Sequence, residues 1–144
     1  MDFDTAAEFF VREILAGRLE PGARLTERDI TEACACTHAF ARNVIQTLQS
    51  LGAVRFDSRR GARVISPADA DPDQVGETWA VLARLLERKS GEPFAAASGE
   101  TAYLRLTAVR AEIDRLTAKG GNARLAHLLK RVALQHEIVR SGGR

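Results

Sequence analysis

Apolar residues recur every three to four positions in three stretches near the start of the chain, and this spacing predicts amphipathic helices. The three predicted helices cover residues 4–17, 26–35 and 37–52. Thr26 and Asp29 stand three positions apart, as the two residues of a capping box do at the start of a helix. Gly52 is placed to end the third helix, because glycine readily adopts the left-handed conformation that closes many helices.

The apolar period changes to two residues directly after this glycine. Val54 and Phe56 alternate with one arginine, and Ala62 and Val64 alternate with another, which predicts two short strands. The intervening sequence DSRRG supplies the turn. Three helices followed by such a hairpin have the order of a winged helix-turn-helix, in which the third helix lies in the major groove of DNA.

The second half of the chain returns to a helical period. Predicted helices cover residues 75–89, 102–116 and 122–140, and Pro93 begins a further short helical piece through FAAAS. Helices alone indicate an antiparallel bundle. We therefore expect a mainly α protein with a winged helix-turn-helix domain at 1–67, a linker at 68–73 and a short helical dimerisation domain at 74–144.

Composition excludes several classes of protein. The chain has 144 residues, of which 45% are hydrophobic, enough for one or two small domains with their own cores. No apolar run reaches the roughly 20 residues of a membrane span, and the acidic start MDFDTAAEFF differs from a secretory signal. Cys34 and Cys36 are too few and too close for a disulfide framework, and core packing is favoured over metal binding for them. We therefore expect a cytoplasmic protein.

Charge is divided unevenly along the chain, although the formal net charge is only +2. Residues 1–35 carry four arginines against eight acids, a balance of −4. Residues 36–66 carry five arginines against one acid, a balance of +4. A segregated basic surface indicates binding to a polyanion, and a solvated charged face is the other interpretation of charge alone.

The segment ILAGRLEPGARLTERDITEACACTHAFARNVIQTLQSLGAVRFDSRRGARV resembles the DNA-binding domain of GntR-family transcription regulators. The resemblance is carried by GRLEPGARLTERD, by the THAFAR that opens the third helix, by LGAV, and by the RRGARV of the wing. It implies a transcription regulator, a repressor, that binds double-stranded DNA. The homodimer would bind a palindromic operator, with each third helix in a major groove.

The resemblance also implies a set of DNA-contacting residues, namely Arg28, Thr37, His38, Arg42, Arg59, Arg60, Gly61 and Arg63. Arg42 is the candidate for base reading, because a guanidinium can donate two hydrogen bonds to guanine. The arginines of the wing are assigned to phosphates. The sequence departs from the family at three positions, with His38 in place of arginine, Phe40 in place of proline and Asn43 in place of glutamate. Base preference can therefore differ from that of the family.

The second half resembles the start of the helical domain of the FadR-type (FCD) branch, through VLARLLE and VALQHEIVRSGG. His136 matches a histidine of that domain, but Val132 stands in place of its acid and Gly143 in place of its asparagine. The chain ends at Arg144, before the helices that supply further histidines, so we expect a shortened domain. We expect no metal site and no cofactor, with His136 as a core or interface histidine. The sequence indicates no small-molecule effector.

Two other functional classes were compared with a self-sufficient regulator. An enzyme has no support, because the sequence has no glycine-rich phosphate loop and no serine, histidine and acid set in a suitable context. An interaction protein that heterodimerises with a full-length regulator and modulates it is the alternative. Because a short bundle would leave apolar stripes uncovered, a homodimer is expected to bury them.

Overall fold

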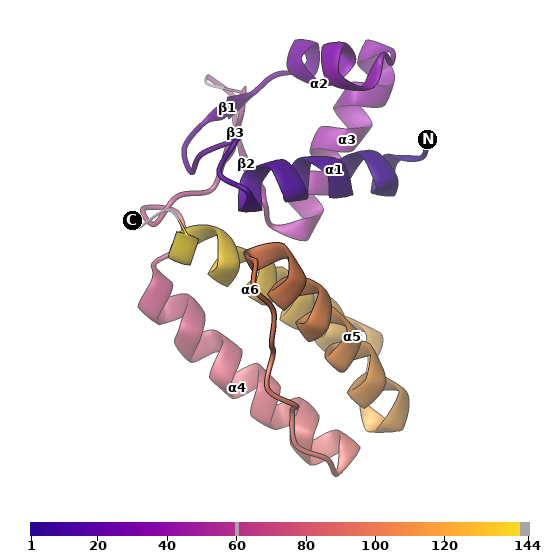
Figure 1. Ribbon diagram of the computed structural model, residues 1–144, viewed down its shortest axis with the longest axis vertical. Coiled ribbons are helices and arrows are strands. Elements are labelled where there is room, and N and C mark those ends of the chain that lie inside the picture. The colour runs from indigo at the N-terminus through magenta and orange to yellow at the C-terminus, as the bar shows by residue number, and fades with distance from the viewer. Residues whose placement is uncertain (60, 142–144) are drawn as a thin grey trace.

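The computed structural model describes residues 1–59 and 61–141, and Figure 1 shows a small N-terminal domain stacked on a helical bundle. The N-terminal domain contains α1 (Phe3–Leu15), β1 (Arg24–Leu25), α2 (Glu27–Cys34), α3 (His38–Leu51), β2 (Val54–Asp57) and β3 (Gly61–Val64). The bundle contains α4 (Pro72–Ser90), α5 (Ala102–Gly120) and α6 (Ala123–Ser141). The chain is mainly helical, as its sequence predicts. In the described ranges, no helix is long and apolar enough to cross a membrane.

Local caps define the helices of the N-terminal domain. The Thr26 hydroxyl accepts from the Asp29 amide at 3.1 Å, and the Asp29 carboxylate accepts from the Thr26 amide at 2.8 Å, so the capping box is confirmed. The Thr37 hydroxyl accepts from the Phe40 amide at 3.2 Å and starts α3. Gly52 ends α3 with a φ of 88°, in the left-handed region. These signals lie within a few residues of each boundary, so they place the turn between α2 and α3 where the sequence predicts it.

The wing is a three-stranded antiparallel sheet and not only the predicted hairpin. Its strand order is β1-β3-β2, and its register aligns Arg24 with Arg63 and Arg63 with Arg55. The next residue of β1, Leu25, is buried in the core on the other face of the sheet. The sequence does not predict β1, because a strand of two residues is too short to show an alternating pattern.

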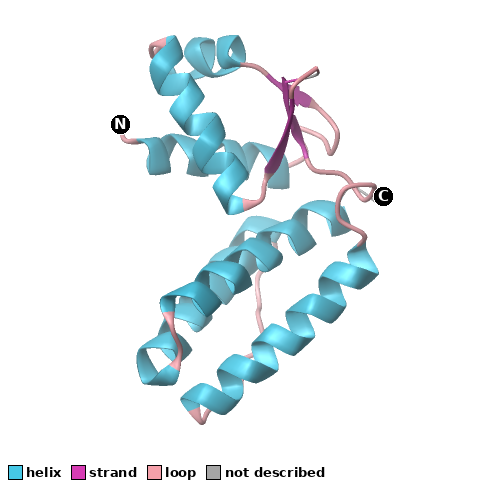
Figure 2. Cartoon of the chain, turned by 180° about the vertical axis from the view of Figure 1, so that it is seen from behind, coloured by secondary structure: helices cyan, strands magenta, loops and turns pink. Residues whose placement is uncertain are grey.

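The three helices of the bundle pack against one another, as Figure 2 shows. Each contributes fully buried side chains to a common core, among them Leu86, Ile113, Leu116 and Leu129. The expectation of an open bundle with uncovered apolar stripes is therefore wrong for these positions. The helix α4 begins at Pro72, so the last residues of the expected linker are helical.

The predicted helical piece at FAAAS is wrong, because residues 93–99 have no regular secondary structure. Carboxylates of the neighbouring helices take up backbone donors of this segment. The Phe94 amide donates to Glu87 at 3.1 Å, and the Ala95 amide donates to Glu112 at 2.8 Å. Since side chains satisfy these two amides, neither of them needs a helical hydrogen bond.

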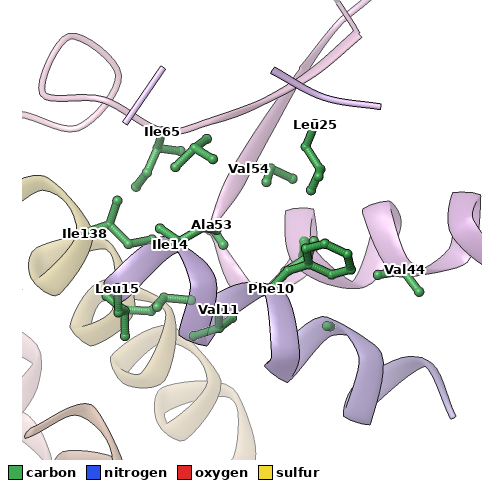
Figure 3. Close-up of a cluster of buried hydrophobic side chains, with 14 of the residues drawn as sticks. Phe10, Val11, Ile14, Leu15, Leu25, Val44, Ala53, Val54, Ile65 and Ile138 are labelled. Carbon is green, nitrogen blue, oxygen red and sulfur yellow. The ribbon is translucent and has the colours of Figure 1, made fainter. Parts of the chain in front are cut away.

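A continuous apolar joint connects the N-terminal domain to the bundle. Figure 3 shows Ile138 of α6 beside Ile14 and Leu15 of α1, and all three side chains belong to one buried cluster. Leu134 of α6 is fully buried in the same cluster. The helix α6 therefore packs against both domains.

Candidate nucleic-acid interface

The first turns of α3 present two basic side chains to solvent. The side chain of His38 is 70% exposed and that of Arg42 is 64% exposed. They stand four residues apart, so they share one face of the helix. Thr37 precedes them, and its hydroxyl is engaged in capping the helix. The N-terminal end of α3 therefore offers hydrogen-bond donors to a ligand.

Glu27 of α2 contacts both of these basic side chains. Its carboxylate accepts a hydrogen bond from Arg42 Nε at 3.1 Å, and its second oxygen lies 3.7 Å from His38 Nδ1. A carboxylate in this place restricts the rotamers of Arg42 and repels a nearby phosphate. Glu27 was absent from the predicted site, because its contact with Arg42 joins two helices across 15 positions of sequence.

Arg28 of α2 also faces solvent. Its Nε lies 2.8 Å from a carboxylate oxygen of Glu32, one turn later on the same helix. Both side chains are exposed, and exposed pairs of this kind contribute little to stability. The guanidinium of Arg28 can therefore exchange Glu32 for a phosphate at small cost.

The tip of the wing lies between β2 and β3. The Arg59 amide donates to Asp57 Oδ1 at 2.9 Å, which helps the chain to turn. Gly61 has a φ of 72°, and a β-carbon there would lie 3.8 Å from the guanidinium of Arg24. Arg24 is thus a wing residue that the sequence did not indicate, since it comes from the acidic part of the chain. Arg60, predicted as a wing-tip contact, lies outside the described residues.

Arg63 is held more firmly than the other arginines of this surface. Its guanidinium donates to the two oxygens of Asp69 at 2.6 and 2.8 Å, and the Ser66 amide and hydroxyl donate to the same carboxylate. These hydrogen bonds, that of Arg63 foremost, lower the pKa of Asp69 to about 2. Arg55 lies 3.4 Å from the same group. Asp69 therefore ties the start of the interdomain linker to the wing.

The residues considered for metal binding lie elsewhere. His136 of α6 lines a cavity of about 380 Å³ together with Trp79 and Phe94. Within residues 1–59 and 61–141, no group of three or more His, Cys, Asp or Glu side chains is placed to hold a metal ion. Cys34 and Cys36 pack at the edge of the apolar core, and burial raises the pKa of the Cys34 thiol.

Comparison with known families finds a match for the N-terminal domain. Residues 4–64 match the family of bacterial regulatory proteins, gntR family. The matched residues are 61 of the 144, so the likeness is one of the N-terminal domain. The match runs from α1 to the end of β3, so it includes every described element that carries the basic surface. The N-terminal domain is therefore similar to the gntR family of bacterial regulatory proteins.

Two solved structures share the fold over both domains. A transcriptional regulator GntR from Rhodococcus sp. RHA1 is similar with a TM-score of 0.64 and 21% identity, over 96% of this chain and 74% of its own. Lar, which controls the expression of the agr system of Listeria monocytogenes, is similar with a TM-score of 0.53 and 17% identity, over 96% and 74% of the two chains. No curated protein matches the sequence. At these identities the two likenesses establish the fold alone.

Proposed function

We propose that the protein is a sequence-specific DNA-binding transcription regulator that acts as a repressor. The observation that carries this proposal is the exposed pair His38 and Arg42 at the N-terminal end of α3, within a domain that matches the gntR family. A helix that presents donors in this way suits the major groove of B-DNA. A protein that occupies an operator excludes other proteins from that DNA, so repression requires no further activity.

The proposed contacts divide by chemistry. Arg42 reads guanine with a bidentate pair of hydrogen bonds, and Thr37 and His38 contact DNA beside it. Gly61 allows the tip of the wing to approach the DNA closely, since it has no side chain. Phosphate contacts come from Arg28, Arg59, Arg60 and Arg63. Arg63 has the additional task of holding Asp69.

A homodimer on a palindromic operator belongs to the same proposal. One chain supplies one recognition helix, and two chains related by a two-fold axis double the base contacts. The bundle has exposed apolar side chains that can contact a second copy, namely Val81, Leu104 and Leu128. The bundle then serves as an FCD-like dimerisation domain, and the protein acts on DNA in the cytoplasm.

Selection from random duplex DNA, with light scattering on the same purified full chain, tests the proposal. We expect a dimer that enriches a palindromic site and binds it about 10³-fold more tightly than random DNA. The affinity should fall steeply as salt rises, because phosphate contacts release counterions. An Arg42→Ala variant carried through the same selection is the matched control, and it should enrich the site poorly.

The opposite results have definite meanings. A chain that enriches no sequence even at low salt contradicts a self-sufficient regulator. Binding that is seen only after mixing with a full-length regulator supports the alternative, an interaction protein that modulates its partner by forming mixed dimers.

A further inference from the structure

A side chain from the bundle caps the C-terminal end of the recognition helix α3. Arg131 of α6 donates from one nitrogen to the carbonyl oxygens of Gln49 and Ser50, both at 2.9 Å. Gln135, one turn later on α6, donates to the Gly52 carbonyl at 3.4 Å. The last carbonyls of a helix have no partners within it and form the negative end of its dipole. The Gln49 carbonyl also accepts from the Gly52 amide at 3.1 Å, so the cation from the other domain adds a second donor to that carbonyl and supplies a donor to the carbonyl of Ser50.

The contact between α3 and α6 is tightly packed. A β-carbon added at Gly52 would lie 2.8 Å from Cγ of Arg131 and 3.1 Å from Nε2 of Gln135. Leu134 and Ile138, on the same helix α6, are buried in the core of the N-terminal domain. The cap therefore belongs to a close-packed joint and is not an isolated surface contact.

A second polar contact joins the domains through α1 and α5. The Glu8 carboxylate accepts from the Tyr103 hydroxyl and from Arg110, both at 2.8 Å. The guanidinium of Arg12 stacks over the Tyr103 ring, 4.6 Å from its centroid. Because two different helices of the N-terminal domain are attached, rotation about either attachment alone is opposed by the other.

The far end of α3 is sensitive to small changes at this joint. Figures 1 and 2 show α3 with one end near the bundle and its N-terminal end directed away from it. The helix has 14 residues. At 1.5 Å per residue, Arg42 lies about 12 Å along the helix from the capped carbonyl of Ser50, and the first residue of α3 lies about 20 Å from the last. A tilt of about 10° would move the backbone at Arg42 by roughly 2 Å, which exceeds the distance range of a hydrogen bond to a base.

We propose that Arg131 is a positioning residue for DNA recognition, which sets the direction of α3 from the bundle. This inference rests on the proposed function. Arg131 acts through the orientation of α3, and phosphate contacts tolerate reorientation better than bidentate base contacts do. Its loss therefore reduces binding to a selected sequence much more than binding to random DNA.

Three variants of the full chain test this inference. Arg131→Ala removes the cap, Arg131→Lys keeps a cation that can donate to both carbonyls, and Arg124→Ala removes the same charge from the exposed start of α6. We expect Arg131→Ala to bind the selected duplex about 5–10-fold more weakly while its affinity for random duplex changes less than about twofold. The other two variants should stay within about twofold of wild type on both duplexes. Thermal unfolding of each variant ensures that affinities are compared for folded protein.

Hydrogen exchange across residues 48–53 measures the joint without DNA. We expect faster exchange in Arg131→Ala than in wild type or Arg124→Ala, because the end of α3 loses its cap. Unchanged exchange overturns the inference, and so does an equal loss, or no loss, of affinity for the two duplexes. A wild-type chain that selects no DNA sequence overturns the proposed function instead. In that event the exchange result alone decides whether Arg131 holds α3.

Discussion

The ion-paired arginines of the N-terminal domain and those of the bundle are covered to different extents. Two on the proposed DNA surface, and Arg55 of β2, project into solvent, with side-chain exposures of 82% for Arg28, 64% for Arg42 and 62% for Arg55. Three in the bundle are more covered, with 30% for Arg105, 21% for Arg110 and 43% for Arg115. All six have carboxylate partners, so exposure and not pairing separates the two groups.

This difference shows how one residue type takes two tasks in the same chain. Arg115 bridges Glu92 and Glu112, and its hydrogen bonds help to lower the pKa of Glu112 to about 2. It thereby holds the segment before α5 against the bundle. An exposed pair such as Arg28 and Glu32 contributes little to stability and leaves the guanidinium available to a ligand. Arg63 is the exception in the N-terminal domain, since only 24% of its side chain is exposed.

The largest expected effect is on DNA binding and concerns Arg42, one of the exposed arginines. Arg42→Ala should weaken binding to the selected duplex by about 1–3 kcal/mol and relax the preference at one base pair, because a bidentate contact to guanine is lost. Titration of duplexes that vary at each position measures this. Arg84→Ala, which removes an exposed arginine from α4, is the control and should leave affinity unchanged. A loss that is uniform over all sequences would count against base reading by Arg42.

The ion pair of Arg63, the covered arginine of the N-terminal domain, predicts that the stability of the protein depends on pH. The pKa of Asp69 is lowered to about 2 from its usual 3.8, so the carboxylate contributes stability that is complete above about pH 4 and is lost as pH falls towards 2. That contribution is about 2 kcal/mol for a shift of this size. Asp69→Asn should remove it, and denaturant unfolding between pH 7 and pH 2 should show a smaller acid loss than in wild type. Glu112 titrates in both proteins, so it does not affect the difference between them. Parallel curves for the two proteins would refute this account.

The close approach between Gly52 of the N-terminal domain and Arg131 of the bundle predicts the next effect, which is on stability. Gly52→Ala should destabilise the folded chain by about 1–2 kcal/mol, because alanine is strained at positive φ and its β-carbon would meet Arg131. Gly76→Ala in α4 is the matched control, since nothing lies within 4 Å of a β-carbon there. Alanine in that helix should raise stability by about 0.5–1 kcal/mol. Denaturant unfolding measures both, and equal effects would exclude a special role for Gly52.

The smallest effects test the comparison directly. Arg28→Ala should weaken binding to selected and random duplexes alike by a few-fold, about 1 kcal/mol or less, and leave the unfolding temperature unchanged. Arg115→Ala should do the reverse and lower the free energy of unfolding without changing DNA affinity. Fluorescence titration measures the DNA affinity of each variant, and thermal unfolding measures its stability. If both variants changed only DNA affinity, or both changed only stability, exposure would not separate the arginines that bind DNA from those that stabilise the fold.

Short-range signals explain why so much of the N-terminal domain could be predicted. The capping box of Thr26 and Asp29 and the left-handed Gly52 act within a few residues, so they are visible in the sequence itself. The segment FAAAS shows the opposite case. Two of its amides, those of Phe94 and Ala95, are satisfied by Glu87 and Glu112 from other helices, and no local pattern in the sequence indicates such partners.

The residues of the candidate site also divide into those that the sequence indicates and those that only the packing of the chain brings to the site. The resemblance to the GntR family indicated His38 and Arg42, because it rests on a short run of consecutive residues, THAFAR, that is visible in the sequence. It did not indicate Glu27 or Arg24, whose places beside them depend on the packing of α2 and on the pairing of β1 with β3. It also assigned Arg63 to phosphate without its carboxylate partner, since Asp69 lies beyond the wing.

By itself the sequence determined the six helices α1 to α6, most of their ends to within a few residues, and that the basic charge begins with the third helix. Periodicity and caps are properties of neighbouring residues, so they do not need the fold. Only the tertiary structure decided which arginines are covered, that the bundle closes on itself, and that Arg131 reaches the end of α3. Those outcomes depend on contacts between residues that are far apart in the chain, such as the 82 positions between Gln49 and Arg131.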